Sequence, residues 1–175
     1  CNKIGASLIQ LLPINDTSND GTWNDSYPYR QTSCFALNPI YIDLLQVIPN
    51  IPPEIEREIK QKREEFEREP LVDYPKVYHF KMDILNRLFK FVELGRPFDE
   101  FVQRNAKWLK PYALYCYFRY IYQTSDFHKW PEYSSINPEE VAQLCEKHYE
   151  DLKFTYWTQY ICDTQFKRSR DYALK

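Results

Sequence analysis

One short apolar run limits the folds open to this chain more than any other feature. Residues 6–12, Ala-Ser-Leu-Ile-Gln-Leu-Leu, form a nearly continuous apolar stretch that ends at Pro13. A run of this kind predicts a strand buried on both faces, as in parallel sheets. No second strand or hairpin signal follows it, and such a strand needs neighbouring strands. We therefore expect the run to belong to a sheet or barrel that lies mostly outside this sequence.

From about residue 54 onward, the sequence has the pattern of helices. Apolar residues recur at helical spacing, and the segments begin or end at proline or glycine. Pro111 suits the first position of a helix, and Asn137-Pro-Glu-Glu140 has the pattern of a capping box. The sequence therefore predicts helices over 54–69, 74–94 and 111–124, and one or two more between 137 and 175.

A long polar loop separates the apolar run from the helices. Residues 13–31 are rich in Asn, Asp, Ser, Thr and Pro, and compact domains seldom carry such long loops unless they are functional. In barrels of alternating strands and helices, the loops after the strands build the active site. We therefore divide the chain into residues 1–45, an early barrel strand with its active-site loop, and residues 46–175, a helical insertion subdomain.

The composition excludes several classes of function. The three glycines, at positions 5, 21 and 95, are too far apart for a phosphate loop or a dinucleotide fingerprint. A net charge of −2 speaks against nucleic acid as a partner, and no apolar run reaches the roughly 18 residues that span a membrane. The five cysteines lack CxxC spacing, so we expect reduced thiols in a cytoplasmic protein and no metal site.

Spacing alone assembles no catalytic centre. The three histidines show neither metal-ligand nor triad spacing. Glycoside chemistry requires two carboxylates held close together. Of the acidic residues we assign Asp25 alone to the site loop, and no second carboxylate is evident opposite it.

The strongest candidate for a site is the segment 23–29, Trp-Asn-Asp-Ser-Tyr-Pro-Tyr. It brings three aromatic rings, an acid and a hydroxyl together in a polar loop. One interpretation is a self-packed Ω-loop in which Asp25 accepts hydrogen bonds from nearby backbone amides. The other is a carbohydrate subsite, where a sugar stacks on a ring while polar side chains bind its hydroxyls. The residues alone leave both interpretations open.

Several motifs, in order along the chain, resemble those of one enzyme family. They are Leu11-Leu-Pro-Ile, the segment 23–29, Ser33-Cys-Phe-Ala-Leu-Asn-Pro39 and Trp108-Leu-Lys-Pro-Tyr-Ala113. They are similar to motifs of the 4-alpha-glucanotransferases of the amylomaltase, or disproportionating enzyme, family. The form Asp-Ser-Tyr-Pro-Tyr looks like that of plant-type cytosolic members.

The resemblance implies an α/β fold: a fragment of a (β/α)8 TIM barrel, made up mostly of the all-helical insertion after an early barrel strand. It implies cleavage of an α-1,4-glucan through a covalent glycosyl-enzyme and transfer to another sugar with retention. The implied partners are maltose, maltodextrin and a glycogen or starch-like glucan, with neither nucleic acid nor membrane. No cofactor and no metal are implied.

The resemblance also implies roles for particular residues. Tyr29 matches the tyrosine that stacks on the sugar at the cleavage subsite, and Ser26 matches the serine beside it. Asp25 matches the acid before that serine. Trp23 and Tyr78 fall where relatives support a glucan chain away from the cleavage point. The nucleophile and the acid/base are implied to lie beyond this sequence, so we expect no catalytic residue within it.

A second hypothesis comes from another class of protein. The charged segment 54–69 and the lack of assembled catalytic groups favour a helical protein-interaction module without enzymatic activity. Its aromatic residues, 17% of the chain, would then form the core. Binding of maltodextrin would distinguish the two hypotheses.

Overall fold

The computed structural model describes residues 5, 8, 10–18 and 22–174, and these are helical with irregular connections. No β-strand occurs within the described part of the chain. The α-helices are α1 (Pro53–Glu67), α2 (Tyr74–Phe89), α3 (Arg96–Tyr122), α4 (Pro138–Lys147) and α5 (Tyr149–Ala173). Short 3₁₀ helices are η2 (Trp23–Ser26), η3 (Pro39–Tyr41), η4 (Leu44–Gln46) and η5 (Phe127–Lys129).

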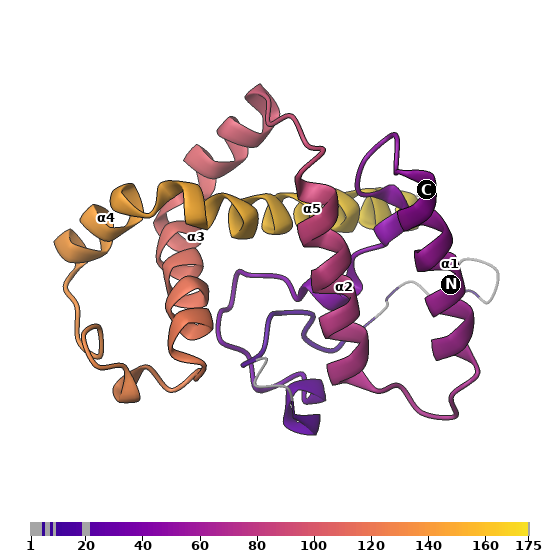
Figure 1. Cartoon of the computed structure of the whole chain (residues 1–175), viewed down its shortest axis with the longest axis horizontal. Coiled ribbons are helices and arrows are strands. Elements are labelled where there is room, and N and C mark those ends of the chain that lie inside the picture. Colours follow the sequence, from indigo (N-terminus) through magenta and orange to yellow (C-terminus); the bar gives the residue numbers. More distant parts are fainter. Residues whose placement is uncertain (1–4, 6–7, 9, 19–21, 175) are drawn as a thin grey trace.

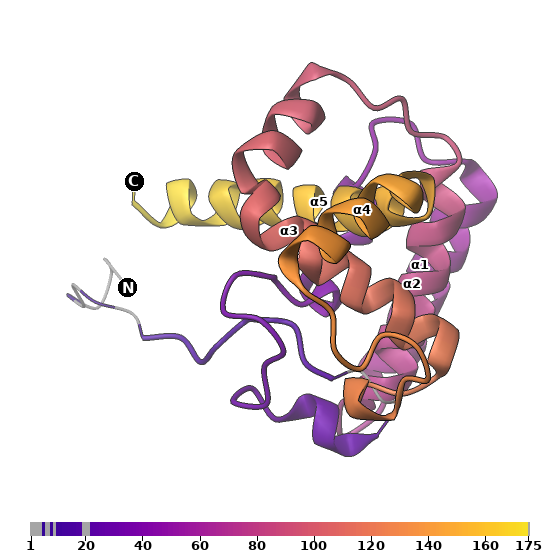
Figure 2. The same ribbon diagram turned by 90° about the vertical axis from the view of Figure 1, so that its left-hand side faces the viewer.

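The long helix α5 crosses the whole molecule. Figure 1 shows α3 and α4 at one end of it and α1 and α2 at the other, with the segment before α1 running through the space between α2 and α3. The C-terminal part of α5 extends beyond the other helices (Figure 2). The most extensive helix packing is that of α3 against α5. The 3₁₀ helix η3 of the segment before α1 contacts both α2 and α5, which follow it in sequence.

Aromatic side chains make up much of the core between these helices. Trp157 and Tyr156 of α5 are almost completely buried. The ring centroid of Phe89 lies 5.2 Å from that of Trp157, and that of Phe101 lies 5.5 Å from that of Tyr160. Each buried ring removes a large apolar area from water. The expected aromatic core is therefore present, although other rings of the chain remain exposed.

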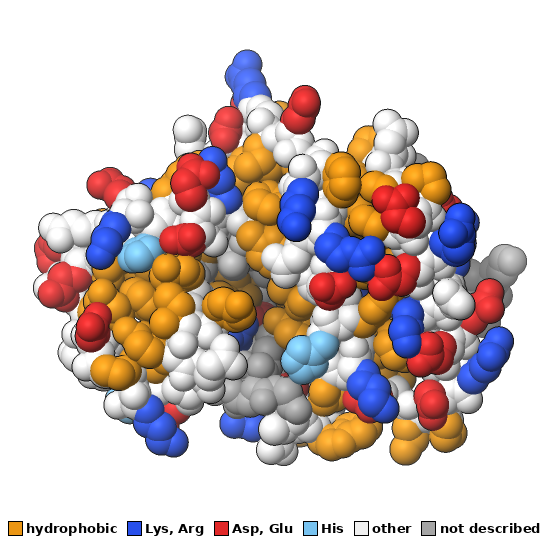
Figure 3. Space-filling view, viewed as in Figure 1, with side chains coloured by type: hydrophobic (Ala, Val, Ile, Leu, Met, Phe, Trp, Pro, Cys, Tyr) orange, Lys and Arg blue, Asp and Glu red, His pale blue; other side chains and the backbone are white. Residues whose placement is uncertain are grey.

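The helix α1 has the charged outer surface that its sequence predicts. Side chains of both signs crowd the surface over α1 and α2 (Figure 3). Ile55 and Ile59 form the buried stripe of α1. One ion pair joins the two helices, because Arg87 Nη1 of α2 lies 2.8 Å from Glu58 Oε2 of α1. Exposed pairs of this kind contribute at most ~1 kcal/mol each, so burial of the stripe does more to fix α1 in place.

The capping box before α4 is confirmed. The Asn137 side chain accepts a hydrogen bond from the Glu140 amide at 2.9 Å, and the Glu140 carboxylate accepts one from the Asn137 amide at 2.8 Å. Two backbone donors of the first turn are satisfied in this reciprocal way. Two helices follow, α4 and α5, which meet at His148.

The expected start of the third helix at Pro111 is wrong. The helix α3 begins at Arg96, directly after Gly95, and Pro111 lies inside it. A proline inside a helix removes one backbone hydrogen bond and bends the helix. Figures 1 and 2 show that α3 changes direction along its length. Packing against α4 and α5 holds both parts of this bent helix. The second helix also ends earlier than expected, at Phe89 instead of residue 94.

The predicted strand over residues 6–12 falls partly outside the described residues, since Ala6, Ser7 and Ile9 are not described. The other residues of the run form no strand, and its three leucines at positions 8, 11 and 12 are 61–79% exposed. No strand of the described chain lies beside them to pair with their backbone groups or to cover their side chains. Exposed apolar side chains that follow one another in this way are typical of a surface that another part of a protein covers.

The loop segment that follows is bound to the helices through its backbone. Gln159 of α5 accepts a hydrogen bond from the Leu37 amide at 2.9 Å and donates one to the Leu37 carbonyl at 2.8 Å. Gln165, further along α5, makes the same pair of bonds with Asp43, at 2.8 and 3.0 Å. Lys81 of α2 donates to two further carbonyls of the loop, at 2.6 and 2.7 Å. These bonds supply the partners that a loop packed between helices requires.

Each of the four cysteines that the structure describes is free. Cys34 is exposed, whereas Cys145 and Cys162 are buried and Cys116 is half-buried. Burial raises the pKa of the Cys116 thiol to about 11 and also raises that of Cys145. Because the thiolate is the reactive form, these buried groups react slowly near neutral pH.

We expect Gln159→Met to lower the free energy of unfolding by about 2–4 kcal/mol, because both polar backbone groups of Leu37 lose their partner in a largely buried place. Gln165→Met is the matched control. It removes the same pair of bonds from Asp43, which water can reach, and the expected loss is about 1 kcal/mol. Urea unfolding measures both values. If the two variants lost the same free energy of unfolding, burial of the Leu37 peptide groups would not explain the stability that Gln159 contributes.

We expect iodoacetamide at pH 8 to modify Cys34 well before Cys116, Cys145 and Cys162. The reason is that Cys116 is almost entirely protonated three pH units below its raised pKa. Peptide mapping by mass spectrometry over a time course measures the order. In denaturant the difference should disappear, and early modification of Cys116 in the folded protein would show that its surroundings are open to solvent.

Candidate functional site

The candidate site is built on two stretches of the loop that pair with each other. Residues 14–18 run antiparallel to residues 31–38, with isolated bridges from Asn15 to Leu37 and from Thr17 to Gln31. The Asp16 amide donates to the Ala36 carbonyl at 2.9 Å. This pairing closes the stretch between the two segments into a loop, and η2 with the segment 23–29 lies on that loop.

The aromatic rings of the segment 23–29 face solvent. Trp23, Tyr27 and Tyr29 are 59–61% exposed. The ring centroids of Tyr27 and Tyr29 lie 5.6 Å apart, with the planes tilted by 59°. Exposed rings at one edge of a fold offer faces on which an apolar surface of a ligand can stack.

Asp25 and Ser26 make hydrogen bonds within the loop itself. The Asp25 carboxylate accepts from the Ser18 hydroxyl at 2.9 Å and from the Thr22 amide at 3.0 Å. The Ser26 hydroxyl donates to the Trp23 carbonyl at 2.7 Å. The structure thus contains the amide contact that the Ω-loop interpretation predicts for Asp25. The Ser26 oxygen can still accept a further hydrogen bond, because a hydroxyl carries two lone pairs.

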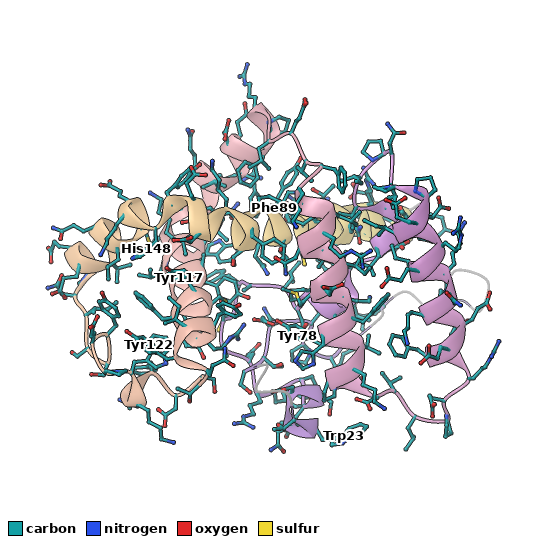
Figure 4. All side chains as sticks on the ribbon, in the orientation of Figure 1. Trp23, Tyr78, Phe89, Tyr117, Tyr122 and His148 are labelled. Carbon is teal, nitrogen blue, oxygen red and sulfur yellow. The ribbon has the colours of Figure 1, made fainter. Side chains whose placement is uncertain are left out.

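Tyr78 lies apart from the exposed rings. It projects from α2, and η2 with Trp23 lies below it in the view of Figure 4. Burial raises the pKa of its phenol, and the nearby Asp16 carboxylate raises it further. The structure therefore places Trp23 in solvent and the Tyr78 hydroxyl beside a buried polar cluster of the loop.

Trp23 lies at the edge of a cavity of about 790 Å³ between the loop, α1 and α2. Apolar side chains of the two helices line much of it, among them Phe66 and Phe80, whose ring centroids lie 5.7 Å apart in an edge-to-face arrangement. Tyr78 is not among its lining residues. The cavity is large enough for a small ligand, and it continues the surface on which Trp23 lies.

Asp16, a second acid of the same loop, was not predicted from the sequence as part of the site. Its side chain is only 1% exposed. Its carboxylate accepts a hydrogen bond from the Tyr112 hydroxyl at 2.7 Å and lies 3.9 Å from the Arg119 guanidinium. Burial, followed by the Asp16 carboxylate, raises the pKa of Tyr112 well above its usual value. The only signal in the sequence was an acid at the fourth position of the polar loop, and its partners lie about a hundred residues later.

Among the described residues, no three His, Cys, Asp or Glu side chains lie close enough together to hold a metal ion. None of the described helices is both long enough and apolar enough to cross a membrane. The features that remain as a candidate site are the aromatic loop and the cavity beside Trp23.

Comparison with known proteins identifies the family. A family model described as 4-alpha-glucanotransferase matches residues 1–175. The 4-alpha-glucanotransferase DPE2 of Oryza sativa subsp. japonica is 36% identical over 178 residues, which cover 98% of this chain and 19% of that protein. The 4-alpha-glucanotransferases of Chlamydia pneumoniae and Clostridium butyricum are 30% and 26% identical, over 99% of this chain and 33% and 35% of their own lengths. The chain thus spans about a fifth to a third of the curated relatives it matches. Because the family model covers every residue, the chain belongs to the 4-alpha-glucanotransferase family.

Proposed function

We propose that this chain is the part of a 4-alpha-glucanotransferase that binds the glucan beside the bond to be cleaved. The observation that carries the proposal is the exposed aromatic loop 23–29 in a chain that the family matches from end to end. The whole protein would cleave α-1,4-glucans such as maltose and maltodextrin and transfer the released unit to glucose or to a glycogen or starch-like glucan, in the cytoplasm. The interaction-module hypothesis does not account for the family match.

The proposed architecture follows from the same membership. The described chain would form the helical insertion of a (β/α)8 barrel, and the exposed leucines at positions 8, 11 and 12 would pack into the barrel sheet. A retaining mechanism requires two carboxylates about 5 Å apart on either side of the glycosidic bond. Neither is proposed within this chain. Its contribution would be to bind and orient the sugar next to them.

The binding roles fit the geometry of the loop. A sugar stacks on the exposed ring of Tyr29, which would fix the plane of the sugar at the cleavage subsite. The Ser26 oxygen would accept a hydrogen bond from a sugar hydroxyl while its own O–H continues to donate to the Trp23 carbonyl. Asp25 keeps the loop in shape through its bonds to Ser18 and Thr22, and it would thereby hold Ser26, the next residue, in position for binding. Orientation of this kind lowers the entropic part of the activation barrier.

Trp23 and Tyr78 would support a more distant part of the glucan. The proposal is supported by the exposed ring of Trp23 and by the cavity of about 790 Å³ at whose edge it lies. Tyr78 would act from α2, above η2. Binding energy at a distance from the reacting bond favours substrates long enough to reach it.

We expect full-length protein that contains this chain to release glucose from maltodextrin and to form longer glucans from it. Tyr29→Ala should lower kcat/KM by about 10–100-fold, taking the ~1–3 kcal/mol of base stacking on an aromatic ring as a guide to sugar stacking. Tyr120→Ala is the matched control, since Tyr120 is exposed on α3, outside the loop. Unchanged kinetics for Tyr29→Ala would exclude its role, and absence of any glucan transfer would exclude the proposed function.

We expect replacement of both Trp23 and Tyr78 by Ala to impair transfer to long maltodextrin acceptors more than transfer to glucose, because glucose cannot reach a distant surface. Initial rates with acceptors of increasing length measure the effect. Thermal unfolding of Trp23→Ala and Tyr78→Ala, measured separately, shows how much of the loss comes from destabilisation. Equal loss with short and long acceptors would indicate that both residues serve the fold.

A further inference from the structure

The stretch Asp16–Ser18 is buried although it is polar and belongs to a loop. The three side chains are 1%, 2% and 5% exposed. Loops usually run over the surface, because their backbone groups then bind water. A buried carboxylate and two buried hydroxyls require partners within the protein. The partners of this stretch are therefore informative about what keeps the loop in its place.

On one side the stretch contacts α3. The Tyr112 hydroxyl donates to Asp16 Oδ2 at 2.7 Å. Arg119 Nη1 lies 3.9 Å from the same oxygen and donates to the Ser18 carbonyl at 3.1 Å. Tyr112 and Arg119 are seven residues apart, which is about two helical turns and places them on one face of α3. This face of α3 is therefore directed at the buried part of the loop.

On the other side the same stretch contacts Asp25. The Ser18 hydroxyl donates to Asp25 Oδ1 at 2.9 Å, and the Thr17 hydroxyl donates to the Asp25 carbonyl at 3.1 Å. The second carboxylate oxygen of Asp25 accepts from the Thr22 amide at 3.0 Å, at the start of η2. Residues 16–18 thus carry hydrogen bonds to α3 on one side and to Asp25 on the other, so this short stretch of backbone connects α3 to the helix turn that carries Trp23 and Ser26.

We propose that Tyr112 and Arg119 are positioning residues for glucan binding, which act on the aromatic loop through Asp16 and Asp25. The inference rests on the proposed function, since it concerns the same loop. Neither α3 residue contacts the exposed rings, but both fix the stretch to which Asp25 is bonded. Without them the loop has more conformations to lose when a glucan binds, and the affinity for the glucan falls accordingly.

The first test is Tyr112→Phe in the full-length protein, which removes a hydroxyl and keeps the ring. The expected result is a KM for maltodextrin raised by about five- to tenfold, within the range of one typical intramolecular hydrogen bond, with kcat within about twofold. Tyr156→Phe is the matched control. Tyr156 is a fully buried tyrosine of α5 whose hydroxyl has no hydrogen-bond partner among the described residues, so its loss should leave KM unchanged.

The second test separates positioning from general stability. Tyr112→Phe is introduced both into the wild-type protein and into the double variant Trp23→Ala, Tyr29→Ala, whose loop lacks two of the rings that the α3 residues are proposed to position. In the double variant, Tyr112→Phe should raise KM no further, although it should lower the unfolding temperature as much as before. An equal rise of KM in both backgrounds, or no rise in either, would overturn the proposal.

The third test does not depend on glucan transfer. Amide hydrogen exchange over residues 22–29 should become several-fold faster in Tyr112→Phe and in Arg119→Lys, and should stay unchanged in Tyr156→Phe, because only the first two remove hydrogen bonds to residues 16–18. Unchanged exchange in the α3 variants would overturn the positioning role whatever the activity. Faster exchange in a protein that transfers no glucan would instead overturn the proposed function and leave the loop contacts established.

Discussion

The structure depends on hydrogen bonds from helix side chains to the backbone of one long loop. Gln159, Gln165 and Lys81 bind peptide groups of residues 37–43, and Arg119 binds those of residues 17 and 18. Four side chains from three helices thereby replace the neighbouring strands that would otherwise satisfy these groups. The loop can consequently lie between helices, where water does not reach much of its backbone, and still present an aromatic edge to solvent.

The aromatic residues of the chain divide between two tasks. Those of α3 and α5 pack against one another and against α2, as the contacts of Phe89 with Trp157 and of Phe101 with Tyr160 illustrate. Those of the loop, Trp23 and Tyr29, lie in solvent although the core has similar rings within it. Their faces are therefore accessible for the glucan stacking proposed above.

The sequence predicted the features that depend on near neighbours and missed those that depend on distant ones. The capping box at Asn137, the existence and most of the span of the first two helices, and the aromatic segment 23–29 could all be recognised from short patterns. Pro111 misled because its local preference for a helix start was outweighed by the packing of α3 on α4 and α5. Asp16 was overlooked because its importance comes from Tyr112, 96 residues away. No spacing rule connects two such positions, so only the fold could bring them together.

The two hydrogen bonds between Gln159 and Leu37 restrict the amino acids that can occupy the two positions to different degrees. Gln159 contacts the amide and the carbonyl of Leu37 and makes no demand on its side chain. A peptide group is common to every residue except for the missing N–H of proline. These two bonds thus exclude only proline at position 37, where the packing of the leucine side chain against the core sets a separate requirement. The helix position, in contrast, requires an amide side chain of this length. The backbone path of this stretch is therefore restricted by α5, while its side chains are restricted by the core against which they pack.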